Sequence, residues 1–185
     1  MPKHPVWIRH VMDGATKRLV EGLYPQSLEV CEISGDSWSD MFRWKSFTRK
    51  HYPEFDICKD EFEEKYDLII AEQVFEHVRH PWEAAKNIYK GLKPGGHFLI
   101  STPFLFHLHP TPLDCWRWTP QGMGFMLEDA GFRPLDIVVD SWGNYDAFLR
   151  HAMIGEAPVY DGSQPIHNIE HIPIMVWALA KKSSA

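Results

Sequence analysis

Residues 107–117 carry side chains whose chemistry can be read from their types and spacing. His107 and His109 are two residues apart, so an extended segment would turn both imidazoles to the same side. Because an imidazole titrates near neutral pH, either ring could remove a proton from a substrate oxygen or nitrogen. Asp114 could fix the tautomer of one imidazole, or form a salt bridge with Arg117 that holds the loop. The candidate catalytic residues are therefore His109, His107 and Asp114.

The same histidines allow a second interpretation, in which a divalent metal ion activates water for hydrolysis. Its ligands would be His107 and His109, together with Asp114 or with histidines from further along the chain, namely His151, His167 and His171. No cysteine accompanies these residues, and the sequence has no His-Glu-x-x-His spacing that would place two ligands on one helical face. We therefore expect no metal centre and keep a metal-dependent hydrolase as the weaker alternative.

Residues 141–173 form a long segment between the last two predicted strands. Loops longer than about 15 residues are usually functional or disordered, and this one is too rich in aromatic side chains for a disordered linker. We expect a cap over a ligand pocket rather than a helical surface insertion, with Tyr145, Phe148 and His151 on one helical face. The candidate substrate-binding residues are Arg117, Trp116, Tyr145 and His151.

An alternation of strands and helices must position these residues. Short apolar runs that end at turn residues predict strands over 28–33, 66–71, 97–102, 135–140 and 174–180. Apolar periodicity, proline and glycine predict helices over 7–23, 81–91 and 120–130. A short helix is expected from Ser37, and a turn over residues 93–96. This alternation implies right-handed crossovers and a mainly parallel sheet.

Ligands of such a sheet bind outside the carboxyl ends of its strands. Four segments follow predicted strands at that edge: 34–38, 72–77, 103–119 and the residues after Asp140. Within the second segment, His77 has the chemistry of a base. Residues that end or follow the first two of these strands include Glu32, Ser34, Gly35, Glu72 and Gln73.

Four segments carry a recognisable pattern: KYDLIIAEQVFEHV (65–78), GLKPGGHFLISTPF (91–104), HLHPTPLDCWRWTP (107–120) and MLEDAGF (126–132). Together they resemble a known enzyme family, the class I S-adenosylmethionine-dependent methyltransferases. They occur in the order and spacing of the second half of that family, and the likeness extends from about Leu28 to Phe132. It implies a three-layer, Rossmann-like, mainly parallel sheet with helices on both faces, shortened between its first and fourth strands.

The resemblance also implies an S-adenosylmethionine site. Glu32 and the turn Ser34-Gly35-Asp36 match the family's acidic strand end and glycine-rich turn, although the family usually has two or three glycines there. Asp56 matches either the acidic residue that ends the next strand and holds the ribose hydroxyls, or the family's third strand. Glu72 and Gln73 match residues that contact the methionine end of the cofactor.

We therefore expect methyl transfer from S-adenosylmethionine to a small-molecule acceptor, with a hydroxyl oxygen preferred over nitrogen or carbon. Such a displacement requires donor and acceptor in line and a group that removes a proton. In the family's pattern the Glu76-His77 pair is usually structural. The turn with one glycine and the missing strand and helix keep open a noncatalytic methyltransferase-like binding protein.

Composition limits the remaining possibilities. A chain of 185 residues with 44% hydrophobic and 24% charged side chains predicts one globular domain, residues 1–185, with 141–173 as an insertion or cap. The net charge of −6, without a run of lysine or arginine, argues against nucleic acid as a partner. Three scattered cysteines and the absence of a signal peptide predict a reducing, cytoplasmic location. No run of about 18 apolar residues suggests a membrane span, and the oligomeric state stays open.

Overall fold

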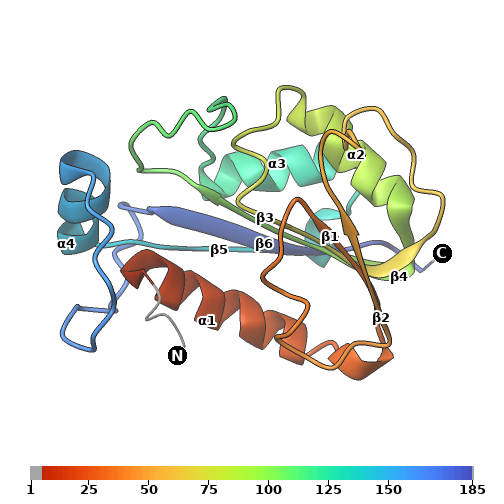
Figure 1. Ribbon diagram of the computed structural model, residues 1–185, viewed down its shortest axis with the longest axis horizontal. Coiled ribbons are helices and arrows are strands. Elements are labelled where there is room, and N and C mark those ends of the chain that lie inside the picture. Colours follow the sequence, from red (N-terminus) through yellow and green to blue (C-terminus); the bar gives the residue numbers. More distant parts are fainter. Residues whose placement is uncertain (1–5, 185) are drawn as a thin grey trace.

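The computed structural model describes residues 6–184 and contains a six-stranded sheet with helices on both faces (Figure 1). The strand order is β2-β1-β3-β4-β6-β5. The strands are β1 (Glu29–Ile33), β2 (Ser46–Lys50), β3 (Tyr66–Glu72), β4 (Leu92–Pro103), β5 (Ile137–Trp142) and β6 (Met175–Lys181).

The strands do not all run in the same direction. β2, β1, β3 and β4 pair in parallel, whereas β6 is antiparallel to both β4 and β5. The predicted α/β sheet is confirmed, and its mainly parallel character is confirmed in part. An antiparallel neighbour needs no crossover helix, so a loop suffices to bring the chain from β5 back along β6.

Three helices cover the sheet. Helix α1 (Trp7–Glu21) lies on one face, and α2 (Pro81–Gly91) and α3 (Pro120–Ala130) lie together on the other (Figure 1). Proline occupies the first turn of α2 and α3, where its missing N–H costs no hydrogen bond. Gly131, at φ 116°, ends α3 in the left-handed conformation that glycine adopts most easily. The predicted bounds of α2 and α3 are confirmed.

The shorter helical elements lie at the connections. They are η1 (Pro25–Ser27), η2 (Pro134–Asp136), α4 (Tyr145–Ala147) and the π-helix η3 (Phe148–Ile154). None of the helices within residues 6–184 is long and apolar enough to cross a membrane.

Only one strand and no helix lies between β1 and β3, over residues 34–65, all of which the structure describes. The short helix expected from Ser37 is wrong, because residues 37–43 form bends and turns. The Glu32 carboxylate accepts hydrogen bonds from the main-chain N–H groups of Ser37 and Trp38, which holds the chain in a turn there.

The second strand lies earlier in the sequence than the resemblance implies. It is the half-exposed segment β2, which pairs with β1. Asp56, expected at the end of a strand, lies in a turn, where its main-chain N–H donates to the Asp60 carboxylate. Phe55 and Ile57 on either side of Asp56 are buried in the core. The apolar positions there reflect the packing of a turn rather than a strand.

β4 begins at Leu92, so residues 93–96 belong to a strand and are not the separate turn that was expected. The pairing of β4 with β3 shifts register between Tyr66 and Leu68, as at a β-bulge. A Cβ atom on Gly96 would lie 2.9 Å from the carbonyl oxygen of Tyr66. Glycine therefore lets the two backbones approach at the bulge.

The segment between β5 and β6 packs against the first turn of α1. The Trp7 N–H donates to the carbonyl oxygen of Pro158 at 2.8 Å. The rings of Trp7 and Trp142 meet edge to face with centroids 5.9 Å apart. His151, in η3, is fully buried beside them. Residues 141–173 therefore cover part of the apolar core on the α1 side.

Candidate functional site

The turn after β1 is built around a buried carboxylate. Glu32 accepts hydrogen bonds from the main-chain N–H of Ser37 at 3.1 Å and of Trp38 at 3.4 Å. A Cβ atom on Gly35 would lie 2.4 Å from Glu32 Oε1, so no larger residue fits without moving the carboxylate. Ser34 adopts φ 55°, a left-handed conformation common for glycine. The turn is thus formed with a single glycine.

The residues at the end of β3 join this turn to α1. The Glu72 carboxylate accepts a hydrogen bond from Trp38 Nε1 at 3.1 Å and forms an ion pair with Arg9. Gln73 has φ 56°, and its side-chain amide donates to Ser101 Oγ at 3.3 Å. Two of the predicted ligand-edge segments are therefore held together by charged hydrogen bonds.

A cavity of about 630 Å³ opens between these segments. This volume falls in the range of roughly 300–1,000 Å³ that is usual for small-molecule sites. Three of the six predicted cofactor residues, Ser34, Asp56 and Gln73, line it. Its other lining residues are mostly apolar or histidine, and they include Ile33, Phe55, Ile57, Val74, His77, Val78, His80, Pro112 and Leu113.

Asp56 faces this cavity although it does not end a strand. Its carboxylate accepts hydrogen bonds from Lys59 Nζ at 2.8 Å and from the Cys58 N–H at 3.0 Å. The Lys59 ammonium holds the pKa of Asp56 below its usual value. The residue that directly follows β2 is instead His51, 3.8 Å from the Asp36 carboxylate. The acidic strand end expected from the family is absent from β2, and Asp56 is the carboxylate that reaches the cavity.

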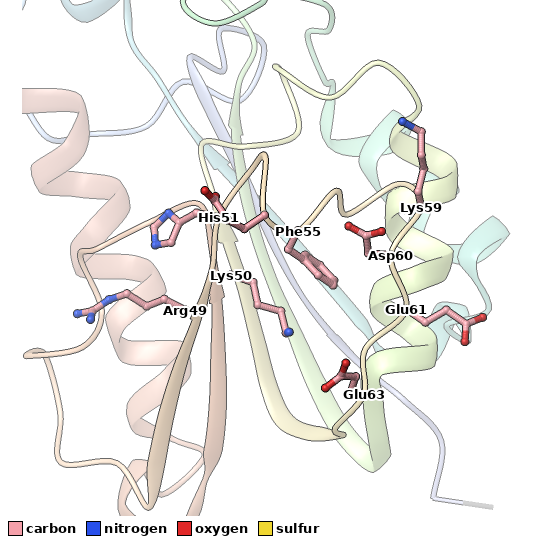
Figure 2. A pocket seen from close by; sticks show the side chains of 9 residues that line it. Arg49, Lys50, His51, Phe55, Lys59, Asp60, Glu61 and Glu63 are labelled. Carbon is pink, nitrogen blue, oxygen red and sulfur yellow. The ribbon is translucent and has the colours of Figure 1, made fainter.

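A second concavity, open and highly polar, lies between β2 and the segment 54–63 (Figure 2). Its volume is about 800 Å³, and charged side chains of both signs line it. Asp60 and Glu61 project from its rim.

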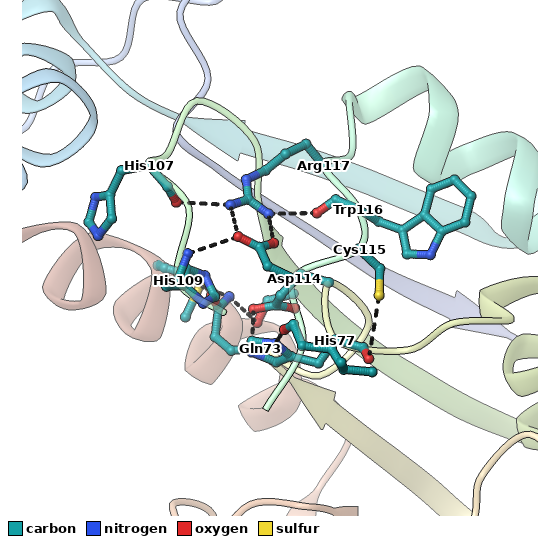
Figure 3. A network of polar contacts seen from close by, with 12 residues as sticks. Gln73, His77, His107, His109, Asp114, Cys115, Trp116 and Arg117 are labelled. Atoms are coloured by element: carbon teal, nitrogen blue, oxygen red, sulfur yellow. Dashed lines mark hydrogen bonds and ion pairs between the residues drawn. The ribbon is translucent and has the colours of Figure 1, made fainter. Parts of the chain in front are cut away.

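Asp114 and Arg117 form an ion pair that fixes the segment 104–119 (Figure 3). The Asp114 carboxylate also accepts a hydrogen bond from the His109 main-chain N–H at 2.8 Å. Arg117 donates to the carbonyl oxygen of His107 at 2.9 Å. The suggestion that Asp114 orients an imidazole is therefore wrong, because its oxygens bind a guanidinium and the backbone. The alternative suggestion, a salt bridge that holds the loop, is confirmed.

The two predicted catalytic histidines have different surroundings. His107 Nδ1 lies 2.8 Å from the carbonyl oxygen of His151, so its ring contacts the segment 141–173. The His109 ring lies beside that of His77, with centroids 5.0 Å apart. Burial lowers the pKa of His109, which favours its neutral form. Of these residues, His77 lines the cavity, and it lies next to the buried residue Glu76.

The predicted substrate-binding residues do not converge on the cavity. Trp116 Nε1 donates to the carbonyl oxygen of Val78 at 2.8 Å. Tyr145 is 60% exposed and bonds to His171, whereas His151 is fully buried. The expectation that Tyr145 and His151 share one helical face is wrong. The chain changes from α-helix to π-helix at Phe148, and this alters the spacing of side chains around the axis.

Sequence reasoning gave too little weight to the pair Glu76 and His77. The Glu76 carboxylate is fully buried, and neither of its oxygens has a hydrogen-bond partner among residues 6–184. Burial raises the pKa of Glu76 to about 8. A charged residue directly before a histidine at a strand's carboxyl edge is the sequence signal, but its burial is not visible there.

Comparison with known proteins gives the family of this chain. A family model described as a methyltransferase domain matches residues 9–134. A search of curated proteins gave no match.

Solved structures show the same fold. An S-adenosylmethionine-dependent methyltransferase of Thermotoga maritima, described as a possible histamine N-methyltransferase, is 12% identical with a TM-score of 0.59, over 95% of this chain and 91% of that one. One from Mesorhizobium loti is 15% identical with a TM-score of 0.56, over 92% and 100%. Phosphoethanolamine N-methyltransferase 2 of Haemonchus contortus, solved with S-adenosyl-L-methionine, is 15% identical with a TM-score of 0.60, over 92% and 52%.

The family match covers more than half of the chain, including β1, β3, β4 and the loops at their carboxyl ends. The cavity between those loops brings together residues that were predicted to bind a cofactor. The chain therefore belongs to the methyltransferase-domain family, and its fold is that of the S-adenosylmethionine-dependent methyltransferases.

Proposed function

We propose that S-adenosylmethionine binds in the cavity of about 630 Å³ and that its methyl group passes to a hydroxyl oxygen of a small acceptor. The observation that carries this proposal is the convergence of Ser34, Asp56 and Gln73, from three separate segments, on one cavity. His77 and Leu113 line the same cavity, so the acceptor enters from the side of residues 104–119.

In this proposal Asp56 binds the ribose hydroxyls. Its present partner, Lys59, is an exposed lysine three residues away, and such surface pairs contribute little net stability. Asp56 can therefore exchange that ammonium for two hydroxyl donors at small cost. The apolar side chains of Ile57 and Val78 supply a surface for the adenine ring. Glu32 acts indirectly, by holding the turn at Ser34 and Gly35.

The acceptor half of the proposal rests on the neutral imidazole of His109. An alcohol, unlike a neutral amine, must lose its proton as it attacks the methyl carbon. A histidine with a lowered pKa is available in the uncharged form that this requires. In the reaction an O–CH₃ bond forms as the S–CH₃ bond breaks, the sulfur keeps the electron pair, and the acceptor proton is released. His109 is the residue through which that proton leaves.

Cofactor binding is tested by calorimetric titration with S-adenosylhomocysteine. Asp56→Ala removes a charged hydrogen-bonding group worth about 1.5–3 kcal/mol, so the affinity should fall at least tenfold. The matched control is Asp136→Ala, because Asp136 also pairs with a cation three residues away but lies at the end of η2 and does not line the cavity. Unchanged affinity in Asp56→Ala would remove this residue from the site. No binding by the unmodified protein would refute the cofactor assignment to this cavity.

Methyl transfer is tested with methyl-labelled S-adenosylmethionine and a panel of small alcohols, phenols and amines. His109→Gln should reduce turnover by about 10² to 10⁴ while leaving affinity for S-adenosylhomocysteine nearly unchanged. His97→Gln is the control, because His97 lies in the middle of β4 and does not line this cavity. An N-methylated product would contradict the hydroxyl acceptor. A panel without any product would favour the noncatalytic binding protein.

A further inference from the structure

Glu76 carries a carboxyl group that is buried without a hydrogen-bond partner in the part of the chain that the structure describes. Its side chain is fully buried, and both carboxylate oxygens lack a hydrogen-bond partner among the described residues. The main-chain carbonyl of Glu76 accepts bonds from the N–H groups of Cys115 and Trp116, so its position is fixed by the segment 104–119. A buried carboxylate without a donor is costly unless it is protonated or faces a cation.

The His77 ring lies close to this carboxylate. His77 Nδ1 contacts the carbonyl oxygen of Leu113, and a carbonyl oxygen can only accept a hydrogen bond. The proton of the neutral ring is therefore on Nδ1, and Nε2 carries a free lone pair. That Nε2 atom lies 3.9 Å from Glu76 Oε1. The Glu76 carboxyl group and this lone pair thus face each other, and no described residue donates a hydrogen bond to the carboxyl oxygens.

His109 completes the group. It comes from the segment 104–119 and approaches His77 (Figure 3), whereas Glu76 and His77 come from the loop that follows β3. One ligand atom from each of Glu76, His77 and His109 lies within 4.8 Å of the other two. The backbone of His109 is held by Asp114, which Arg117 fixes in turn. All three side chains are therefore anchored by contacts that leave a ligand atom available.

We propose that Glu76, His77 and His109 bind a divalent transition-metal ion of the class of Zn²⁺, Mn²⁺ or Co²⁺. Two imidazoles and one carboxylate suit these ions, whereas Mg²⁺ and Ca²⁺ prefer oxygen ligands alone. Metal–ligand bonds of about 2.1 Å require the three atoms to close by roughly 1 Å from their present separations. The cation supplies the positive charge that the buried carboxylate lacks.

This site differs from the one considered from the sequence. Asp114 is paired with Arg117, and His107 bonds to the carbonyl oxygen of His151. Of His107, His109 and Asp114, only His109 therefore belongs to the proposed site as well. The proposed site also uses Glu76 and His77, which that set omitted.

The part that the cation plays in methyl transfer rests on the proposed function, although its binding does not. His77 belongs both to the metal group and to the cavity lining, so the ion would lie beside the bound cofactor. One carboxylate and two neutral imidazoles leave one positive charge on a divalent ion, which favours an acceptor oxygen that has lost its proton to water. With the ion bound, the His109 lone pair is held by the metal, so the acceptor proton passes to water and His109 acts on the acceptor only as a metal ligand.

Metal binding is tested on the full chain after treatment with a chelator and exchange into metal-free buffer. Titration with Co²⁺, followed by visible absorption and calorimetry, should show one ion per chain. Glu76→Gln and His109→Gln should each weaken binding at least about tenfold. His107→Gln is the matched control, because its ring is near His109 but outside the group. Circular dichroism establishes that each variant is folded.

The outcomes separate the two proposals. Absence of stoichiometric Co²⁺, Mn²⁺ and Zn²⁺ binding by the folded chain would overturn the metal site, as would equal affinity in Glu76→Gln and the unmodified protein. S-adenosylhomocysteine binding in the metal-free protein would then still support the proposed cofactor site. Failure of S-adenosylhomocysteine to bind, with Co²⁺ bound as expected, would refute the cofactor cavity and leave the metal site.

Discussion

Replacing Gly35 by alanine tests the turn that follows β1. The new Cβ atom would lie 2.4 Å from Glu32 Oε1 and 2.9 Å from Glu32 Cδ, distances that packed atoms do not tolerate. Because Glu32 is 1% exposed, its carboxylate can move only by giving up its bonds to the N–H groups of Ser37 and Trp38. Each such bond to a charged group contributes about 1.5–3 kcal/mol.

When S-adenosylhomocysteine binds to the variant, the turn must therefore form without at least one of these hydrogen bonds. We expect the affinity for S-adenosylhomocysteine to fall between about tenfold and a hundredfold in Gly35→Ala, as measured by calorimetric titration. Gly14→Ala is the control, because its Cβ would meet Arg18 Nη1 at an ordinary 3.6 Å inside helix α1. The control should be stabilised by up to about 1 kcal/mol without a change in affinity. A folded Gly35→Ala variant that binds within about twofold of the original would refute the role assigned to this turn.

Two further predictions concern the loops around the site. Burial lowers the pKa of His151 from 6.5 to about 4, so between these values the unfolded chain binds a proton that the folded chain does not. The contribution of a neutral His151 to the free energy of unfolding is complete above pH 6.5. This free energy should fall by about 3 kcal/mol as the pH falls from 6.5 to 4. Urea unfolding of the original protein and of His151→Phe at pH 7 and pH 4 should show this difference, and parallel pH profiles would disprove it. Asp114→Asn should lower the free energy of unfolding by about 2 kcal/mol, because Arg117 loses its charged partner in a nearly buried pair. Arg133 and Asp136 form an exposed pair, so Asp136→Asn should change stability by less than about 1 kcal/mol. Equal effects of Asp114→Asn and Asp136→Asn would contradict the structural role of Asp114.

The bounds of α2 and α3 were predictable from the sequence, because each bound is set by residues close to it in the chain. Pro81 and Pro120 fix the backbone at the first turn, and Gly131 adopts a conformation that most residues avoid. The apolar runs of β1, β3, β4 and β6 were likewise recognisable, because strands buried on both faces need apolar side chains at nearly every position. The family itself followed from motifs of neighbouring residues, whose order does not depend on the packing of distant segments.

The strand β2 was missed for the opposite reason. Its sequence, SFTRK, has one strongly apolar residue, and its place at the edge of the sheet leaves most side chains half-exposed. Its pairing with β1 provides the hydrogen bonds that hold it as a strand, although its composition does not predict one. Asp56 was consequently assigned to a strand, whereas the structure has a turn that still brings its carboxylate to the cavity.

The sequence alone determined the class of fold, the enzyme family and the residues at the carboxyl edge of the sheet. The tertiary structure decided which of those residues meet. His77 and His109 are separated by a helix and a strand in the chain, yet their rings are neighbours. Asp114 binds Arg117 instead of an imidazole, and Glu76 is buried without a partner among residues 6–184. Contacts of this kind depend on the packing of distant segments and on the exclusion of water, neither of which the spacing of residues along a chain records.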